Sequence, residues 1–346
     1  MRTLGALLRG PRSVPPPDWD ARPYRVLFLR YERIGDLIMA TGILRAIARS
    51  HRTITVDALV SPAAAPVLEQ NPYVSRVLTL DRHSRGSYAR VLREVRGARY
   101  DAVVDGRLNH AAAYTSTPLL LLASRAPYRI GTGGGAADRI YNVRLPEYDR
   151  TVPYVEGSKV LAEPFGVDPS TVDWQPEIFL SETERAWADV VWETTRGGAG
   201  GRRLLVNLSA SEPRRRWADS HFVAVLRDVR THWPAIPIVL IGLPSEWERV
   251  HAVADAVGEG VRAEPTPDLR HALALVARAE RVITPDTSIS HAASAFRLRS
   301  VVLLKREHHP YAPWNTPAEL VFWDGNTIAG LAEAPVIAAV RRLLEG

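Results

Sequence analysis

The sequence predicts an α/β protein made of two doubly wound domains that face each other across a cleft. The chain has 346 residues, more than a single hydrophobic core usually organises. Short apolar strands alternate with helical segments, and this alternation starts a second time after residue 180. Continuous apolar strands between helices are typical of a parallel sheet that helices cover on both faces.

The first half begins with a Pro-rich leader, residues 1–23, which cannot continue a helix. The segments after it predict an N-terminal domain over residues 24–175. Strands are expected at 25–30, 53–60, 74–80 and 101–105, and helices at 37–50, 62–71 and 88–96.

The second half repeats the pattern after a linker, residues 165–184, that is rich in proline and turn formers. It predicts a C-terminal domain over residues 176–346. Strands are expected at 203–208, 236–241, 281–284 and 300–304, and helices at 220–232, 245–257, 268–279 and from Ser288 onward. In such domains the loops at the carboxyl ends of the strands contact the ligand.

Composition and charge narrow the class of protein. The chain has no cysteine, which excludes disulfide scaffolds, thiolate catalysis, iron–sulfur clusters and cysteine-based zinc sites. The net charge is +6, and residues 1–50 hold nine arginines against four acids, a surplus of 9 − 4 = +5. Because the chain has only two lysines, a general bias toward arginine accounts for part of this surplus. A basic N-terminal surface suits an acidic substrate or an anionic membrane surface.

The sequence does not support nucleic-acid binding or a membrane-spanning segment. No helix-turn-helix spacing and no interleaving of aromatic and basic residues supports nucleic-acid binding, so no nucleic acid is expected. No apolar run reaches the roughly 18–20 residues that span a bilayer. We expect a cytoplasmic protein, either free or in peripheral contact with the inner face of the membrane.

Asp36 is the first candidate for chemistry. It follows Gly35 after the strand that ends at Arg30, at the start of a predicted helix. A carboxylate at this strand end is expected to point into the cleft, where it can act as a general base. The alternative is a helix N-cap, for which aspartate is among the preferred residues.

The loop after the strand at 203–208 is the second candidate. It carries Ser209, Ser211 and three successive arginines, with Arg215 in the middle. Hydroxyl and guanidinium groups at a strand end suit a diphosphate. A solvated basic loop is the alternative.

The third and fourth candidates follow two further strands of the second half. Asp286, Thr287 and Ser288 begin a helix of small residues, whose free N–H groups suit an anion, and His291 lies one turn further on. Glu246 also follows a strand end, where acidic residues accept hydrogen bonds from ribose hydroxyls. The alternatives are a structural histidine and a glutamate that favours the first turn of a helix.

Two other motifs are rejected. The run 131–136, GTGGGA, lacks a strong preceding strand and the Lys-Ser/Thr of a phosphate-binding loop. Glu307, His308 and His309 suggest a metal, but no further ligands have supporting spacing. No metal and no cofactor are therefore expected.

Together, the segments RVLFLRYERIGDLIMATGILRAI, NLSASEPRRRW, IGLPSE and ITPDTSISHAA resemble family 9 glycosyltransferases, the lipopolysaccharide heptosyltransferase-like proteins. The resemblance spans roughly residues 24–330. It implies the two-Rossmann GT-B fold. It also implies inverting, metal-independent transfer of a sugar, often heptose, from a nucleotide diphosphate donor such as ADP-heptose to a hydroxyl of a glycan, a glycolipid or a small molecule.

The resemblance also implies residue roles. Asp36 takes the place of the catalytic base, Arg215 that of a lysine that binds the donor phosphate, and Glu246 that of the acid that binds the ribose. The other expected donor-binding residues are Ser209, Ser211, Asp286, Thr287, Ser288 and His291. The chain differs from the family at Arg215, where the family has lysine, and at Ser288, where the family has glycine.

The acceptor is expected in the N-terminal domain. The acceptor half carries Arg30, Arg33, Arg107 and Arg139, which favour an anionic acceptor. Asp105, at the end of the strand DAVVD, is the next candidate base. Two other functions remain open. One is a nucleotide-sugar 2-epimerase on the same fold, and the other is a non-catalytic protein that binds nucleotide sugars or polyanions.

Overall fold

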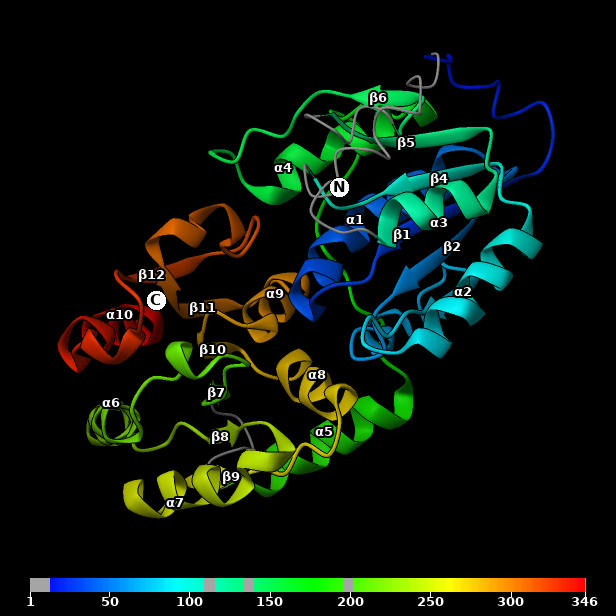
Figure 1. Cartoon of the computed structure of the whole chain (residues 1–346). Helices are drawn as coiled ribbons and strands as arrows, with labels where there is room; N and C mark the ends of the chain where they lie inside the picture. The colour runs from blue at the N-terminus through cyan, green and yellow to red at the C-terminus, as the bar shows by residue number, and fades with distance from the viewer. Residues whose placement is uncertain (1–12, 109–115, 134–139, 196–201, 346) are drawn as a thin grey trace. The chain divides into compact units, whose positions relative to one another are not determined.

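The computed structural model describes residues 13–108, 116–133, 140–195 and 202–345 (Figure 1). The chain forms two compact units, Met1–Gln175 and Pro176–Gly346. The boundary falls inside the Pro-rich segment that the sequence predicts to be a linker.

Unit 1 contains a parallel sheet of six strands in the order β3-β2-β1-β4-β5-β6. The strands are β1 (Tyr24–Arg30), β2 (Ile54–Val60), β3 (Arg76–Thr79), β4 (Ala102–Asp105), β5 (Tyr128–Thr132) and β6 (Val143–Leu145). The helices are α1 (Ile34–Ser50), α2 (Arg85–Ala98), α3 (Ser116–Ser124) and α4 (Tyr154–Ser158), with short 3-10 helices η1 (Ala65–Leu68) and η4 (Lys159–Phe165). The strand order reverses between β1 and β4, so the loops after these two strands lie where doubly wound domains bind their ligands.

Unit 2 repeats the arrangement with the order β12-β11-β10-β7-β8-β9. The strands are β7 (Leu204–Asn207), β8 (Ile238–Ile241), β9 (Val261–Ala263), β10 (Arg281–Pro285), β11 (Arg299–Lys305) and β12 (Ala318–Trp323). The helices are α5 (Glu182–Thr194), α6 (Asp219–His232), α7 (Trp247–Val257), α8 (Leu269–Ala277), α9 (Ser288–Ala295) and α10 (Glu333–Glu345). The short 3-10 helices η5 (Pro213–Arg215), η6 (Pro244–Glu246), η7 (Arg306–Tyr311) and η8 (Ile328–Gly330) lie in the loops.

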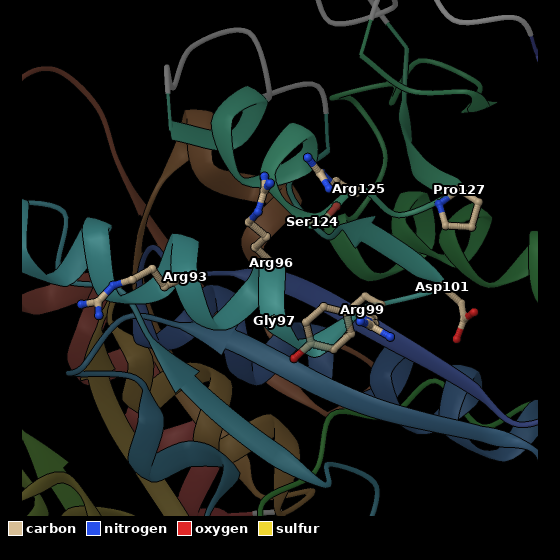
Figure 2. A pocket seen from close by; sticks show the side chains of 9 residues that line it. Arg93, Arg96, Gly97, Arg99, Asp101, Ser124, Arg125 and Pro127 are labelled. Atoms are coloured by element: carbon tan, nitrogen blue, oxygen red, sulfur yellow. The ribbon is translucent and has the colours of Figure 1, made fainter.

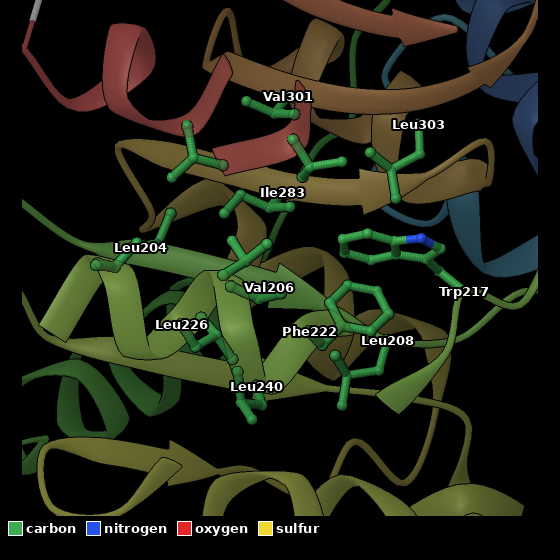
Figure 3. Close-up of a cluster of buried hydrophobic side chains, with 14 of the residues drawn as sticks. Leu204, Val206, Leu208, Trp217, Phe222, Leu226, Leu240, Ile283, Val301 and Leu303 are labelled. Atoms are coloured by element: carbon green, nitrogen blue, oxygen red, sulfur yellow. The ribbon is translucent and has the colours of Figure 1, made fainter. Parts of the chain in front are cut away.

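The hydrophobic core of unit 2 holds the loop that follows β7. Trp217 is buried in this core and makes an edge contact with Phe222, with ring centroids 5.0 Å apart (Figure 3). Its indole N–H donates a hydrogen bond to the carbonyl oxygen of Leu331 at 2.8 Å. A buried tryptophan with its polar atom paired is a rigid anchor. Trp217 therefore fixes the arginine run that immediately precedes it.

The described end of the N-terminal leader, residues 13–23, contacts unit 1 through Trp19. Trp19 is buried, stacks on Phe165 and donates a hydrogen bond to the carbonyl oxygen of Pro164 at 2.7 Å. The apolar area of Trp19 is therefore buried against the domain that the sequence predicts to begin at residue 24.

The strands and helices named from the sequence are present, with one exception. The helix expected at 62–71 is the single 3-10 turn η1, because Pro66 cannot supply an N–H group to a longer helix. Within the described residues, no helix is long and apolar enough to cross a membrane.

Glu184 joins the start of α5 to α8. Ser181 and Glu184 form a reciprocal N-terminal cap, and both carboxylate oxygens of Glu184 accept hydrogen bonds from Arg270 at 2.6 Å. The bonds from Arg270 lower the pKa of Glu184 from 4.5 to about 2. This contact therefore stabilises the fold above pH 4.5 and is lost as the pH falls toward 2.

Substitution of Glu184 tests this linkage. Glu184→Gln keeps the capping shape but removes the charge, so the free energy of unfolding should fall by about 1 kcal/mol near neutral pH. The difference in the free energy of unfolding between this variant and the unsubstituted protein should shrink in acid. Urea titrations near neutral pH and in acid can measure it. A difference of the same size at both pH values would contradict the role of the charge.

Candidate active site

Ser209 and Glu246 come together at the carboxyl edge of the unit 2 sheet. Ser209 follows β7 and Glu246 follows β8, which are neighbouring strands. The Ser209 hydroxyl donates a hydrogen bond to the Glu246 carboxylate and accepts one from the backbone N–H of Leu243 at 2.7 Å. Arg216 lies 3.0 Å from the second carboxylate oxygen of Glu246. Arg249 lies 3.6 Å from the same oxygen. The Ser209–Glu246 pair thus forms a buried acceptor group next to two arginines that the sequence did not indicate.

Arg215, Asp286 and His308 form a second cluster at the same edge. A guanidinium nitrogen of Arg215 lies 3.2 Å from Oδ2 of Asp286, and Nδ1 of His308 lies 2.7 Å from the same oxygen. Burial opposes ionisation of Asp286, but the bond from His308 and the charge of Arg215 outweigh it and lower the pKa of the carboxyl. The cluster therefore holds an ionised acid between two cationic or donor groups.

His308 corrects the sequence interpretation. The sequence indicates no role for the His308–His309 pair beyond an unsupported metal motif, yet His308 in η7 contacts Asp286. Among the described residues, no group of three or more histidine, aspartate and glutamate side chains is arranged to hold a metal ion.

Helix α9 begins beside this cluster. Thr287 is its N-cap, and its hydroxyl accepts a hydrogen bond from the backbone N–H of Ile289 at 3.3 Å. Asn207, at the end of β7, donates to the same hydroxyl at 3.2 Å. Ser288 is the first residue of the helix, and His291 is buried at the end of its first turn. Because the Thr287 hydroxyl accepts the hydrogen bond of the Ile289 N–H, one of the backbone N–H groups expected to bind an anion at this helix start is already paired.

The rest of the β7 loop is more open. Arg214 is 57% exposed and pairs with Glu212 at 2.6 Å, whereas the Arg215 side chain is only 11% exposed. Ser211 is exposed. Of the three arginines, Arg215 is the one that the fold buries next to Asp286.

In unit 1, Asp36 lies on the first turn of α1 next to Arg30. The helix begins at Ile34 with Arg33 as its N-cap, so the alternative role of Asp36 as the N-cap is wrong. One guanidinium nitrogen of Arg30 lies 3.5 Å from Oδ2 of Asp36, and Arg30 Nε donates to the backbone carbonyl oxygen of Asp36 at 3.4 Å. The Asp36 side chain is 21% exposed, whereas that of Arg30 is 3% exposed. Arg30 therefore orients a carboxylate that solvent can still reach.

Glu32 extends this contact into the protein. It lies 2.9 Å from Arg30 and 3.7 Å from Arg107, and its own side chain is 9% exposed. Burial raises the pKa of Glu32, against the opposing charges of the two arginines. Sequence reasoning missed Glu32, although it stands in the same YERIGD turn as Asp36.

Asp105 and Arg107 form a buried ion pair, and Arg107 is also the residue that contacts Glu32. Arg107 donates two hydrogen bonds to the Asp105 carboxylate at 2.9 Å, and the Tyr141 hydroxyl donates a third at 2.6 Å. Burial and the nearby carboxylate raise the pKa of Tyr141. The side chains of Asp105 and Arg107 are 1% and 0% exposed, so neither can contact an acceptor directly. Arg107 instead contacts Glu32, which pairs with Arg30. Arg33 is exposed, and Arg139 lies outside the described residues.

Comparison with known proteins decides the family. The model of glycosyltransferase family 9, described as heptosyltransferase, matches residues 88–326. The chain belongs to glycosyltransferase family 9. This match covers all the donor-side candidates together with Asp105 and Arg107, and it begins after Asp36. The expected activity class, a glycosyltransferase, is therefore confirmed. No curated protein matches the chain.

Solved structures support the fold of this family 9 glycosyltransferase. A family 9 glycosyl transferase from Veillonella parvula DSM 2008 is 18% identical with a TM-score of 0.78, and the match covers 95% of this chain and 99% of that one. The E. coli ADP-heptose lps heptosyltransferase II is 17% identical with a TM-score of 0.72, covering 93% and 98%. The E. coli heptosyltransferase WaaC with ADP-2-deoxy-2-fluoro heptose is 20% identical with a TM-score of 0.69, covering 93% and 99%. The expected GT-B fold is confirmed.

Proposed function

We propose that the protein transfers a sugar, heptose by preference, from a nucleoside diphosphate donor to a hydroxyl group of a glycan, glycolipid or small-molecule acceptor, with inversion and without a metal. The buried Arg215–Asp286–His308 cluster at the start of α9 is the observation that carries the donor class. A guanidinium, an imidazole and a helix N-terminus at one sheet edge suit a diphosphate. The similar E. coli structures are an ADP-heptose lps heptosyltransferase II and WaaC with ADP-2-deoxy-2-fluoro heptose, which supports ADP-heptose as the first donor to test.

Unit 2 binds the donor in this proposal. The Glu246 carboxylate, held by Ser209 and Arg216, accepts hydrogen bonds from the ribose hydroxyls. Arg215 and the N–H groups at the start of α9 contact the diphosphate, and Ser211, Thr287, Ser288 and His291 line the same region. These groups stabilise the negative charge that develops on the leaving nucleoside diphosphate.

Unit 1 supplies the base. The Asp36 carboxylate takes the proton of the acceptor hydroxyl as its oxygen bonds to the anomeric carbon and the bond from that carbon to the diphosphate breaks. Arg30 holds Asp36 in place, and Arg107 and Asp105 hold Glu32, which pairs with Arg30. Arg33 and Arg139 remain candidates for contact with an anionic acceptor, and we propose that the protein works in the cytoplasm, free or at the membrane surface.

A donor panel tests the substrate class. ADP-, GDP-, UDP- and dTDP-sugars are compared by thermal shift, because a ligand at 100 times its dissociation constant adds about 2.7 kcal/mol of stability. We expect the ADP-sugar to give the largest shift. The alternative function is a 2-epimerase, because two UDP-N-acetylglucosamine 2-epimerase structures share this fold at 15% and 13% identity. It would be supported if a UDP-sugar binds best and is converted to its 2-epimer without an acceptor.

Metal independence is a separate prediction. Asp286, the one acid of this cluster, is already paired with Arg215 and His308, whereas Mg²⁺ needs several oxygen ligands in octahedral geometry. Transfer should continue in excess EDTA with little change in rate. A rate that collapses with chelator and returns on addition of Mg²⁺ or Mn²⁺ would refute this part of the mechanism.

A further inference from the structure

A cluster of arginines lies at the opposite edge of the unit 1 sheet from Asp36. It lines a cavity of about 650 Å³ between the C-terminal end of α2, the start of β4 and the turn after α3 (Figure 2). Arg93, Arg96, Arg99 and Arg125 contribute the positive charges. Asp101 is the one acid in the lining, so the cavity wall carries 4 − 1 = +3.

Most of the positive charge of this cluster has no partner among the described residues. Arg93 Nε donates a hydrogen bond to the carbonyl oxygen of Ala89 at 3.2 Å. Asp101 accepts hydrogen bonds from Arg22 at 2.6 Å and from the backbone N–H of Arg25 at 2.8 Å, so its charge is satisfied by other groups. The guanidinium groups of Arg96, Arg99 and Arg125 have no partner among the described residues. All three residues are exposed.

Two of these arginines occupy positions that favour glycine. Arg99 ends α2 with φ 54° and Arg125 follows α3 with φ 54°, in the left-handed region. Side chains with a Cβ atom are disfavoured there, and glycine is the usual residue after a helix. The fold therefore does not require arginine at either position.

An apolar surface adjoins the arginines on α3. Leu119 and Leu122 lie one helical turn apart, 54% and 51% exposed, and Arg125 follows three residues after Leu122. In the part of the chain that the structure describes, only Val190 and Leu243 are other large hydrophobic side chains exposed to a similar degree. Helix α3 packs against α2, and Arg125, directly after α3, lines the same cavity as the arginines of α2.

We propose that this α2–α3 surface, formed by Arg93, Arg96, Arg99, Arg125, Leu119 and Leu122, docks the protein onto an anionic lipid bilayer. Unpaired guanidinium groups are attracted to acidic headgroups, and a pair of exposed leucines beside them inserts at the boundary of the acyl chains. The inference rests on unit 1 alone and does not depend on the proposed catalytic roles.

Vesicle binding tests the charges. The protein should partition to vesicles of phosphatidylglycerol and phosphatidylcholine, less so as salt rises, and hardly at all to phosphatidylcholine alone. Each arginine contributes roughly a factor of five near an anionic surface. Replacement of Arg96, Arg99 and Arg125 by glutamine should thus lower partitioning by about 100-fold. The matched control replaces Arg49, Arg52 and Arg185, exposed arginines that do not line the cavity, and should lose far less.

Glycine variants separate binding from folding. Arg99→Gly and Arg125→Gly place the preferred residue in each left-handed position, so thermal stability should be kept or increased. Partitioning to anionic vesicles should nevertheless fall about fivefold for each substitution. Unchanged partitioning in both glycine variants would overturn the proposal.

The absence of cysteine allows a direct test of insertion. Leu122→Cys carries the only thiol of the chain and accepts an environment-sensitive dye, and Val190→Cys on α5 is the control, with Val190 58% exposed. Anionic vesicles should shift the emission of the dye at position 122 to the blue and leave the control unchanged. Bilayer docking would be overturned by an equal shift at both positions or by no shift at position 122. It would also be overturned by a shift at position 122 that grows with protein concentration in the absence of lipid.

Discussion

Asp36→Asn is expected to lower the rate of sugar transfer by a factor of about 10² to 10⁴, the usual contribution of a general base. Asparagine keeps the size of the side chain and an oxygen that can accept a hydrogen bond from Arg30, so the local geometry is retained. It cannot take a proton from the acceptor hydroxyl. Because we place the donor contacts in unit 2, the affinity for the donor should remain nearly unchanged, as calorimetry can measure.

The control for this variant is Asp149→Asn, which removes an exposed carboxylate of the same unit whose side chain bonds only to Thr151. It should transfer sugar at the normal rate. Near-normal activity of purified Asp36→Asn would refute Asp36 as the base. The buried acid Glu32 then becomes the next candidate, ahead of Asp105, because Asp105 is already bonded to Arg107 and Tyr141.

Arg215→Ala is expected to weaken binding of the donor and of the free nucleoside diphosphate by about 10- to 100-fold, the range for a lost charged hydrogen bond. The effect on the nucleoside monophosphate should be smaller. The truncation also removes the charge of Arg215 from beside Asp286, so the pKa of the Asp286 carboxyl should be higher than in the unsubstituted protein.

Two further variants check the position of this contact. Arg215→Lys restores the charge that the family resemblance expects at this position and should recover most of the affinity. Arg214→Ala removes a cation that is exposed and paired only with Glu212, and should bind donor normally. A larger loss in Arg214→Ala than in Arg215→Ala would show that the wrong arginine has been assigned to the diphosphate.

The central strands of both sheets were predictable because they are continuous apolar runs. RVLFLR, DAVVD and IPIVLI each read as buried strands and lie in β1, β4 and β8. The edge strands β6 and β9 have only three residues each, too few for a pattern to show. Helix α10 is different, because its buried residues follow a helical period that is visible in the sequence: Val336, Ala339, Val340 and Leu343.

The site was predictable where one segment of chain supplies the residues. The Asp-Thr-Ser start of α9 follows from a local motif, whereas only the family resemblance distinguishes Arg215 from its two neighbours. The contact of Arg216 with Glu246 depends on loops from two strands, and the contact of His308 with Asp286 depends on η7, which follows a third. Sequence spacing does not reveal which of three consecutive arginines faces which acid, so these pairings needed the fold.

The proposed reaction is tested most directly by following ADP-heptose with water as the only acceptor, in the presence of EDTA, by proton NMR. The account predicts slow release of ADP and a free sugar whose first-formed anomer has the configuration opposite to that of the donor. It also predicts that Asp36→Asn and Arg215→Ala both slow this release. Saturable binding without any turnover, or a first-formed anomer that retains the donor configuration, would contradict it.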